Sequence, residues 1–419
     1  MSPNVSANIP KKSHASDKLD DKNGLEGEHA DMPDHGSFMG FRRADGRVGT
    51  RNHVLVLSLV GLVSGAARRI ARTVRGTLLV ATPYGRGQFG DDKIVHERQL
   101  IGLGRNPNVA AVLVVGADRK TADRVGAAIA AAGKPVEIVA LDDVHEDSLA
   151  LSEHGVRRAA ALVRAVSRLP RVACPMADLF VGVECGHSDA TSGLGANPLA
   201  GAAIDLLVEA GGRAVFGETV EWLGAEHLLA RRAASAEVAR TLVDAVARRE
   251  AAVAATGFDL TGNNPGQENI RGGLSTIEEK SLGAIAKGGT KPIRGVLAIA
   301  EEPTQPGLHV MDAPAFSPES LTGFAASGAN LMLFTTGAGN SFCNAIAPTL
   351  KISVRPDTVA HLPHQIDFDG SAILAGREEI PAAGRRLFEL IRATASGALS
   401  WGEILDEGDE TFIRTGGSL

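Results

Sequence analysis

Residues 53–170 alternate between short apolar runs rich in β-branched side chains and longer segments with helical periodicity. The apolar runs are typical of buried strands, and this alternation is typical of a parallel sheet covered by helices on both faces. We expect a Rossmann-like domain over 39–172, with its boundary near residues 170–175. The pattern predicts strands at 53–60, 77–81, 109–117 and 136–143, and helices at 63–76, 91–105, 120–134 and 146–169.

The second half contains the same kinds of element with less regular spacing. A Ser-x-x-Glu pattern from Ser275 to Glu278 predicts a capping box at the start of one helix. We expect a larger mixed α/β domain over 173–419 that does not repeat the first, so the fold class is α/β. Strands are expected at 179–184, 213–218, 295–302, 331–336 and 349–354, and helices at 197–212, 218–235, 234–257 and 275–289.

Composition excludes several classes of partner. The chain has 419 residues and a net charge of −6, which favours neither nucleic acid nor an anionic membrane. No segment approaches the roughly 18 consecutive apolar residues of a membrane span. Three cysteines do not make a disulfide framework, so we expect a cytoplasmic protein. Residues 1–38 are polar and lack an apolar signal core, and we expect them to form a disordered tail.

The stretch GVECGHSDATSGLGANP, residues 182–198, lies between an expected strand and an expected helix. Its glycines let a ligand approach the backbone, whose N–H groups can hold an anion at such a turn. Cys185, His187 and Asp189 are candidates for acid–base work, and Ser188 and Asn197 for substrate binding. The alternative is a capping turn in which Ser188 or Asp189 is the N-cap.

Three other segments carry candidate site residues. Glu218 and Glu221 are spaced i and i+3, which places both carboxylates on one helix face where they could bind a divalent cation. Glu279 and Lys280 could supply a base and a cation for an anion. Thr336 and Gly337, in TTGAGN after an apolar strand, suit binding of a carboxylate by backbone amides. The alternative for the acidic pairs is a solvated helix start favoured by the helix dipole.

Acids, hydroxyls, a thiol and an imidazole therefore gather in loops at strand ends. Removal of a proton next to a carboxylate needs such groups, because a base takes the proton and an acid protonates the leaving hydroxyl. A dinucleotide-dependent oxidoreductase is disfavoured, since VGLVSG at 60–65 is not the glycine fingerprint of those enzymes.

Long motifs over residues 40–419 resemble the altronate/galactarate dehydratase family. They include GFRRADGRVGTRN, VECGHSDATSGLGANPLAG, GETVEWLGAEHLLARRA, GGLSTIEEKSLGAIAKGG and GLHVMDAPAFSPESLTGFAASGANLMLFTTGAGN. The resemblance implies a hydro-lyase that converts a sugar acid into a 2-keto-3-deoxy acid. It also implies a divalent metal, Fe²⁺ or Mn²⁺ before Mg²⁺, for which Glu218 and Glu221 are the candidate ligands. A sulfo-lyase acting on sulfolactate has a similar sequence, which leaves loss of sulfite as an alternative reaction.

The chain departs from the family pattern in two ways. Full-length members carry a small N-terminal domain that we do not find here, so a separate small subunit is an expected partner. Three cysteines and a histidine of the family are replaced in the first domain, partly by Arg86 and Arg119. These arginines could bind the anionic end of the substrate, or pair with Asp91, Asp92 or Asp118 in a site that has lost its function. In that case a non-catalytic subunit is a further alternative.

We therefore predict a metal-assisted sugar-acid dehydratase that acts on a small anionic substrate. Homo-oligomerisation is expected only because soluble enzymes commonly form symmetric assemblies.

Overall fold

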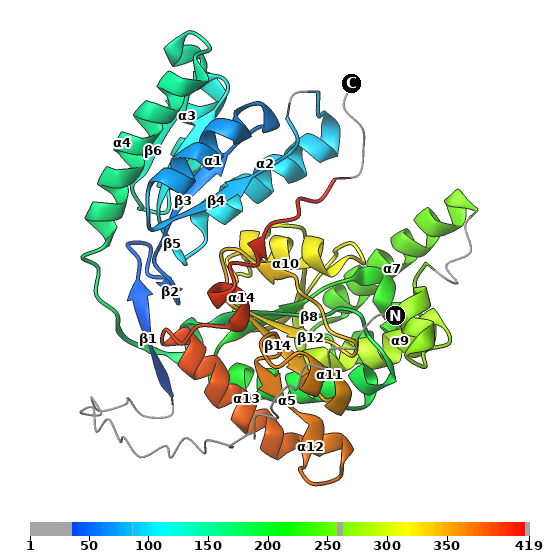
Figure 1. Ribbon diagram of the computed structural model, residues 1–419. Coiled ribbons are helices and arrows are strands. Elements are labelled where there is room, and N and C mark those ends of the chain that lie inside the picture. The colour runs from blue at the N-terminus through cyan, green and yellow to red at the C-terminus, as the bar shows by residue number, and fades with distance from the viewer. Residues whose placement is uncertain (1–35, 86, 258–262, 415–419) are drawn as a thin grey trace, which may run out of the picture. The chain divides into compact units, whose positions relative to one another are not determined.

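The computed structural model describes residues 36–85, 87–257 and 263–414 (Figure 1). All of these described residues belong to one compact unit. Strand β1 (Ser37–Arg42) includes the last two residues of the expected tail, 37 and 38. It pairs antiparallel with β7 (Val172–Pro175). Residues 1–35 of the expected tail lie outside the described residues.

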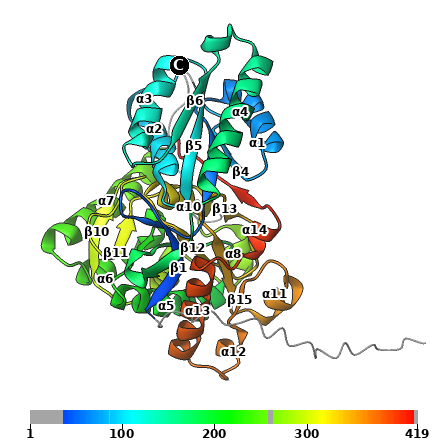
Figure 2. The same cartoon turned by 90° about the vertical axis from the view of Figure 1, so that its left-hand side faces the viewer.

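The first domain is built on a parallel sheet of four strands in the order β4-β3-β5-β6. Alternate residues of β3 point to opposite faces: Val54 and Val56 pack with α1 and α4, whereas Leu55 and Leu57 pack with α2 and α3. The predicted parallel sheet with helices on both faces is confirmed (Figure 2). The strands are β3 (His53–Ser58), β4 (Thr77–Ala81), β5 (Val109–Gly116) and β6 (Val136–Ala140), and the helices are α1 (Ser64–Thr73), α2 (Gly90–Arg105), α3 (Arg119–Ala130) and α4 (Ser148–Val166).

The second domain contains a parallel sheet of seven strands in the order β10-β11-β9-β8-β12-β14-β15. Strands β8, β11, β12 and β14 are buried along their length, and helices α5 and α13 pack together in the core beside the sheet. The predicted larger α/β domain is thus confirmed. The strands are β8 (Phe180–Cys185), β9 (Arg213–Phe216), β10 (Ile293–Leu297), β11 (Gly307–Met311), β12 (Leu331–Thr335), β14 (Thr349–Ser353) and β15 (Phe368–Asp369). The main helices are α5 (Asn197–Glu209), α7 (Ala236–Thr256), α9 (Ile277–Ala284), α10 (Ser317–Ala326) and α13 (Ile380–Ala395).

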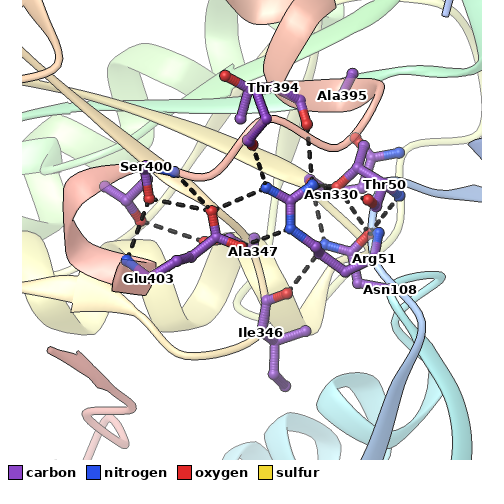
Figure 3. Close-up of polar contacts among 12 residues, drawn as sticks. Thr50, Arg51, Asn108, Asn330, Ile346, Ala347, Thr394, Ala395, Ser400 and Glu403 are labelled. Carbon is purple, nitrogen blue, oxygen red and sulfur yellow. Dashed lines mark hydrogen bonds and ion pairs between the residues drawn. The ribbon is translucent and has the colours of Figure 1, made fainter. Parts of the chain in front are cut away.

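A buried polar seam joins the two domains (Figure 3). The Arg51 guanidinium donates to the carbonyl oxygens of Thr394 and Ala398 and pairs with the Glu403 carboxylate. Asn108 donates to the carbonyl oxygens of Asn330 and Ile346. Because each buried donor meets an acceptor across the seam, displacing one domain would leave several buried polar groups without partners.

Several local predictions are wrong in detail. The helix expected over 218–235 is two short ones, η5 (Thr219–Trp222) and α6 (Glu226–Arg231), because Gly224 between them has a φ of 81°. Helix α9 has Thr276 as its N-cap, whose hydroxyl accepts from the Glu279 amide, so the capping box from Ser275 to Glu278 is not formed.

Strand β11 and helix α10 were not predicted. The prolines in MDAPAFSPES suggest a loop, but Pro318 lies in the first turn of α10, where the missing N–H has no intrahelical acceptor to lose. Among the described helices, none is both long and apolar enough to cross a membrane.

Candidate active site

A cavity of about 930 Å³ opens at the carboxyl ends of β8, β9 and β12 in the second domain. Strand–helix turns converge at this edge of a parallel sheet, which is where such sheets bind their ligands. Acidic, amide and hydroxyl side chains dominate the lining. The polar lining residues are Cys185, His187, Ser188, Glu218, Glu221, Asn263, Asn264, Glu268, Asn269, Lys280, Ser317, Asn340, Ser341, Glu407 and Asp409.

A buried ammonium group lies beneath this cavity between two carboxylates. Lys287 Nζ is 2.6 Å from Glu184 Oε2 and 3.4 Å from Glu218 Oε2. Glu184 also accepts from the Gly217 amide, and Glu218 accepts from the Ser317 hydroxyl at 2.8 Å. All three charged side chains are at most 2% exposed, so these contacts stand in for the water that burial removes.

Burial gives Glu218 an unusual titration. Removal from water, and then the neighbouring carboxylates of Glu184 and Glu221, raise the pKa of Glu218 well above its usual range. Burial would lower the pKa of Lys287, but Glu184 and Glu218 raise it instead. Glu218 therefore holds its proton to a higher pH than an ordinary glutamic acid does, while Lys287 keeps its charge.

A second acid–lysine pair lies in the wall of the cavity. Lys280 Nζ is 2.6 Å from Glu221 Oε1 and 2.8 Å from Asn264 Oδ1. Burial would raise the pKa of Glu221, but Lys280 and Lys287 lower it, so Glu221 is a carboxylate. Lys280 thus presents a fixed positive charge to whatever occupies the cavity.

The turn after β8 contributes a thiol, a hydroxyl and an imidazole. Cys185 Sγ is 2.7 Å from Ser188 Oγ, and both side chains are buried. His187 has a φ of 51°, and its Nδ1 is 2.7 Å from the carbonyl oxygen of Gly339. A carbonyl oxygen can only accept, so Nδ1 donates and a neutral ring leaves the Nε2 lone pair to act as an acceptor or base.

Other predicted residues of this turn lie outside the cavity. The Asp189 carboxylate accepts from Thr191 and Ser192 and is 3.1 Å from Arg355 Nη1, as a capping group would be. Asn197 accepts from the Thr335 hydroxyl and donates to the Gly283 carbonyl oxygen.

The predicted carboxylate-binding loop is also directed inward. The Thr336 hydroxyl accepts from the Gly339 amide. The Gly337 carbonyl oxygen accepts from Thr358, and a Cβ on Gly337 would overlap the Asp189 carboxylate. The structure gives both residues roles in holding the loop together.

The remaining predicted residues lie elsewhere. Glu279 is exposed and accepts from the amide of Ser275 at its own helix start. Arg119 is about half exposed and pairs with Asp123 and Asp143, which are neither substrate groups nor the acids expected as its partners. Arg86 lies outside the described residues.

Sequence reasoning missed Glu184, Lys287 and Ser317. Glu184 is the acid in FVGVEC, and Lys287 interrupts the apolar segment GAIAKGG. A charged residue within an apolar run was the available signal, because such a side chain is buried only with a partner. The identity of the partner depends on contacts between segments about one hundred residues apart.

The predicted metal ligands do not fit a divalent cation in this arrangement. Glu218 faces the Lys287 ammonium, and Glu221 faces that of Lys280. Among the described residues, no three His, Cys, Asp or Glu side chains are grouped so as to hold a metal ion. The metal remains a prediction from the resemblance, and no step below depends on it.

Comparison with known proteins agrees with the resemblance. Residues 40–167 match the family model described as D-galactarate dehydratase/altronate hydrolase, second domain, and residues 176–417 match D-galactarate/altronate dehydratase, C-terminal. The (2R)-sulfolactate sulfo-lyase subunit beta of Chromohalobacter salexigens is 42% identical over 90% of this chain and 97% of that protein. Altronate dehydratase of Bacillus subtilis is 31% identical over 91% of this chain and 78% of its own length. Galactarate dehydratase (L-threo-forming) of Escherichia coli is 31% identical over 86% and 73%. The chain belongs to the galactarate/altronate dehydratase family, whose members named here are lyases.

Proposed function

We propose that this protein is a lyase that removes water from a sugar acid and yields a 2-keto-3-deoxy acid. The observation that carries the proposal is the buried Glu218, whose pKa is raised, in a cavity that also contains His187 and Lys280. An acid, a base and a fixed cation are the groups that an elimination next to a carboxylate needs.

The proposed roles follow from the charge state of each group. His187 Nε2 takes the proton from C2, and the electron pair of that bond forms the C2–C3 double bond. The C3–O bond breaks, and Glu218 gives its proton to the departing hydroxyl, which leaves as water. Lys280 stabilises the negative charge that develops on the substrate carboxylate. The enol product then tautomerises to the 2-keto acid.

Loss of sulfite in place of water is the second candidate. It is supported by the 42% identity to a protein named as a sulfo-lyase subunit, against about 31% for two of the dehydratases. Proton removal from C2 would be the same, but sulfite is a weaker base than hydroxide and needs less help from an acid. The two reactions therefore differ in how strongly they should depend on Glu218.

We further propose that a small second subunit completes the site. Lys280 is the one lysine or arginine among the described lining residues, against five carboxyl side chains. An anionic substrate would need further cationic groups, which another chain could supply. Leu194, Leu282 and Phe316, which line this cavity or the adjoining one, are each more than half exposed, as expected of a surface that a partner covers. The sulfo-lyase relative is itself named as a subunit beta.

The test is a screen for 2-keto acid formation from aldonates, aldarates and sulfolactate. It is run with Fe²⁺, Mn²⁺ or Mg²⁺, and with or without a small subunit encoded beside this chain. A keto acid from one sugar acid would support the hydro-lyase, and a keto acid with equimolar sulfite from sulfolactate would support the second candidate. No product from the folded protein with its small subunit would refute both.

A further inference from the structure

The first domain contains a cavity of about 300 Å³ that the proposed reaction does not use. Leu59 and Val60, which follow β3, form one side, and Ala117 and Asp118, which follow β5, form the other. The chain leaves β3 toward β4 on one side and later returns to β5 on the opposite side. The cavity thus lies where the winding of the sheet reverses, the place where open parallel sheets bind ligands.

Most of the cavity wall is apolar. Leu59, Val60, Leu100 of α2 and Val125 of α3 supply its aliphatic lining. Two basic side chains line the cavity, Lys93 and Arg124. Arg124 pairs with Glu97, whereas Lys93 is exposed and has no ion pair among the described residues. Such a slot suits a flat or compact apolar body with a polar edge.

His96 supplies a polar group that the protein itself does not satisfy. Its side chain is 6% exposed and lines the cavity, and neither ring nitrogen has a hydrogen-bond partner among the described residues. The buried Nε2 of Gln88, also in the lining, has no partner there either. Buried polar atoms are nearly always hydrogen-bonded in folded proteins, so these three nitrogens are available to a bound molecule.

The charge state of His96 narrows the ligand chemistry. Burial, and then the Arg414 guanidinium, lower the pKa of His96 to about 4, so the ring is neutral at pH 7. A neutral imidazole offers one donor and one acceptor, and the Gln88 amide adds a donor. A complementary ligand has a hydrogen-bond acceptor beside a donor on one edge. Adenine has such an edge, with N7 as the acceptor and the N6 amino group as the donor.

We propose that this cavity, the switch-point crevice, binds an adenine nucleoside or its monophosphate. The base lies between the aliphatic side chains of Leu59, Val60, Leu100 and Val125, with its polar edge on His96 and Gln88. Lys93, which is exposed and lines the cavity, would contact the phosphate.

The crevice is connected to the candidate active site through the end of the chain. The His96 ring packs against Phe412, with ring centroids 5.5 Å apart. Gln99 exchanges two hydrogen bonds with the backbone of Ile413. Glu407 and Asp409, a few residues earlier, line the active-site cavity. A ligand on His96 would therefore restrain the segment that contributes to the other site.

Isothermal titration calorimetry with adenosine and with AMP on the full chain tests the proposal and requires no turnover. We expect binding of one equivalent per chain, and tighter binding of AMP if Lys93 contacts the phosphate. His96→Phe keeps a ring between Tyr84 and Phe412 but removes both nitrogens, so it should weaken binding roughly tenfold or more.

His154→Phe is the matched control, because His154 is exposed on α4 of the same domain and should leave binding unchanged. Gln88→Leu provides a second test if His96→Phe does not fold. The proposal would be overturned if neither probe bound up to millimolar concentration. It would also be overturned if His96→Phe and Gln88→Leu both bound the probes as tightly as the unchanged protein does. Slower amide exchange over residues 407–414 on binding would support the connection to the active site, and unchanged exchange would refute that connection alone.

Discussion

The buried polar side chains at the carboxyl edges of the two sheets differ in whether they have partners within the protein. At the second sheet, Glu184 and Glu218 share the Lys287 ammonium, and Glu221 pairs with Lys280. At the first sheet, the ring nitrogens of His96 have no described partner. The difference indicates that the reacting groups are positioned before any substrate arrives, which favours catalysis, whereas the first edge is complete only when a ligand binds.

The C-terminal segment lies between these two edges. Its residues run from Asp409, at the active-site cavity, to Phe412, at the ring of His96. Substitutions at the two edges and in this segment should therefore have distinguishable effects on activity and stability.

Glu218→Gln should reduce kcat by roughly 10²- to 10⁴-fold, because the amide cannot protonate a leaving hydroxyl. The unfolding temperature should change little, since the amide still accepts from Ser317. Steady-state kinetics on the substrate found by the screen, together with thermal unfolding, measures both. Glu279→Gln is the control and should retain activity, because Glu279 is exposed and outside the cavity. Full activity in Glu218→Gln would favour sulfite as the leaving group or remove Glu218 from the reaction.

Lys287→Met should lower the free energy of unfolding by about 3–5 kcal/mol, because it leaves the Glu184 carboxylate buried without its counter-ion. Urea denaturation measures this change. Adding Glu184→Gln should recover part of the loss, since the double variant has no unpaired charge. Lys291→Met, at an exposed pair with Glu209, should have little effect. Equal, small effects at both lysines would contradict the view that the second edge is held together by internal charge pairing.

Glu410→Gln should stabilise the protein at pH 8 more than at pH 5. Burial raises the pKa of Glu410 to about 8, and its carboxyl accepts from Asn344. Between pH 4.5 and 8 the unfolded chain loses this proton while the folded protein keeps it, so the free energy of unfolding falls as pH rises. The glutamine variant cannot ionise and escapes that fall, which we expect to be worth about 4 kcal/mol across the window. Thermal unfolding at several pH values measures the difference. A stability difference independent of pH would show that Glu410 is ionised in the folded protein.

Chelation should leave the unfolding temperature of the isolated chain unchanged. Glu218 and Glu221, which were predicted as metal ligands, already face the ammonium groups of Lys287 and Lys280. Loss of a metal should therefore leave neither side chain without a counter-ion. Metal analysis before and after dialysis against a chelator, followed by thermal unfolding, measures this. A bound stoichiometric metal whose loss lowers the unfolding temperature would show that the carboxylate–lysine pairs rearrange around it.

The first domain could be predicted closely from the sequence because its elements depend on local pattern. β4 matches the predicted 77–81, and β5 ends one residue before the predicted strand. The second domain was predicted less well where prolines and glycines occur inside elements. Pro318 within α10 and Gly224 between η5 and α6 act through backbone geometry that the periodicity does not reveal.

The site followed the same division. Local spacing identified the 182–198 turn and the acids at 218 and 221, and the cavity contains Cys185, His187, Ser188, Glu218 and Glu221. Local spacing could not separate Asp189 from these, because its pairing with Arg355 joins segments 166 residues apart. Local spacing also could not show that Lys280 pairs with Glu221, because the two residues are on different elements.

The sequence by itself determined the parallel sheet of the first domain, the α/β class of the second and the family, because buried strands, helix faces and long motifs are written locally. Only the tertiary structure decided which acids have raised pKa values, which are paired and which merely cap a turn. The physical reason is that a carboxyl group's charge depends on burial and on charges within a few ångströms, and those neighbours, such as Lys287 for Glu184, come from distant parts of the chain.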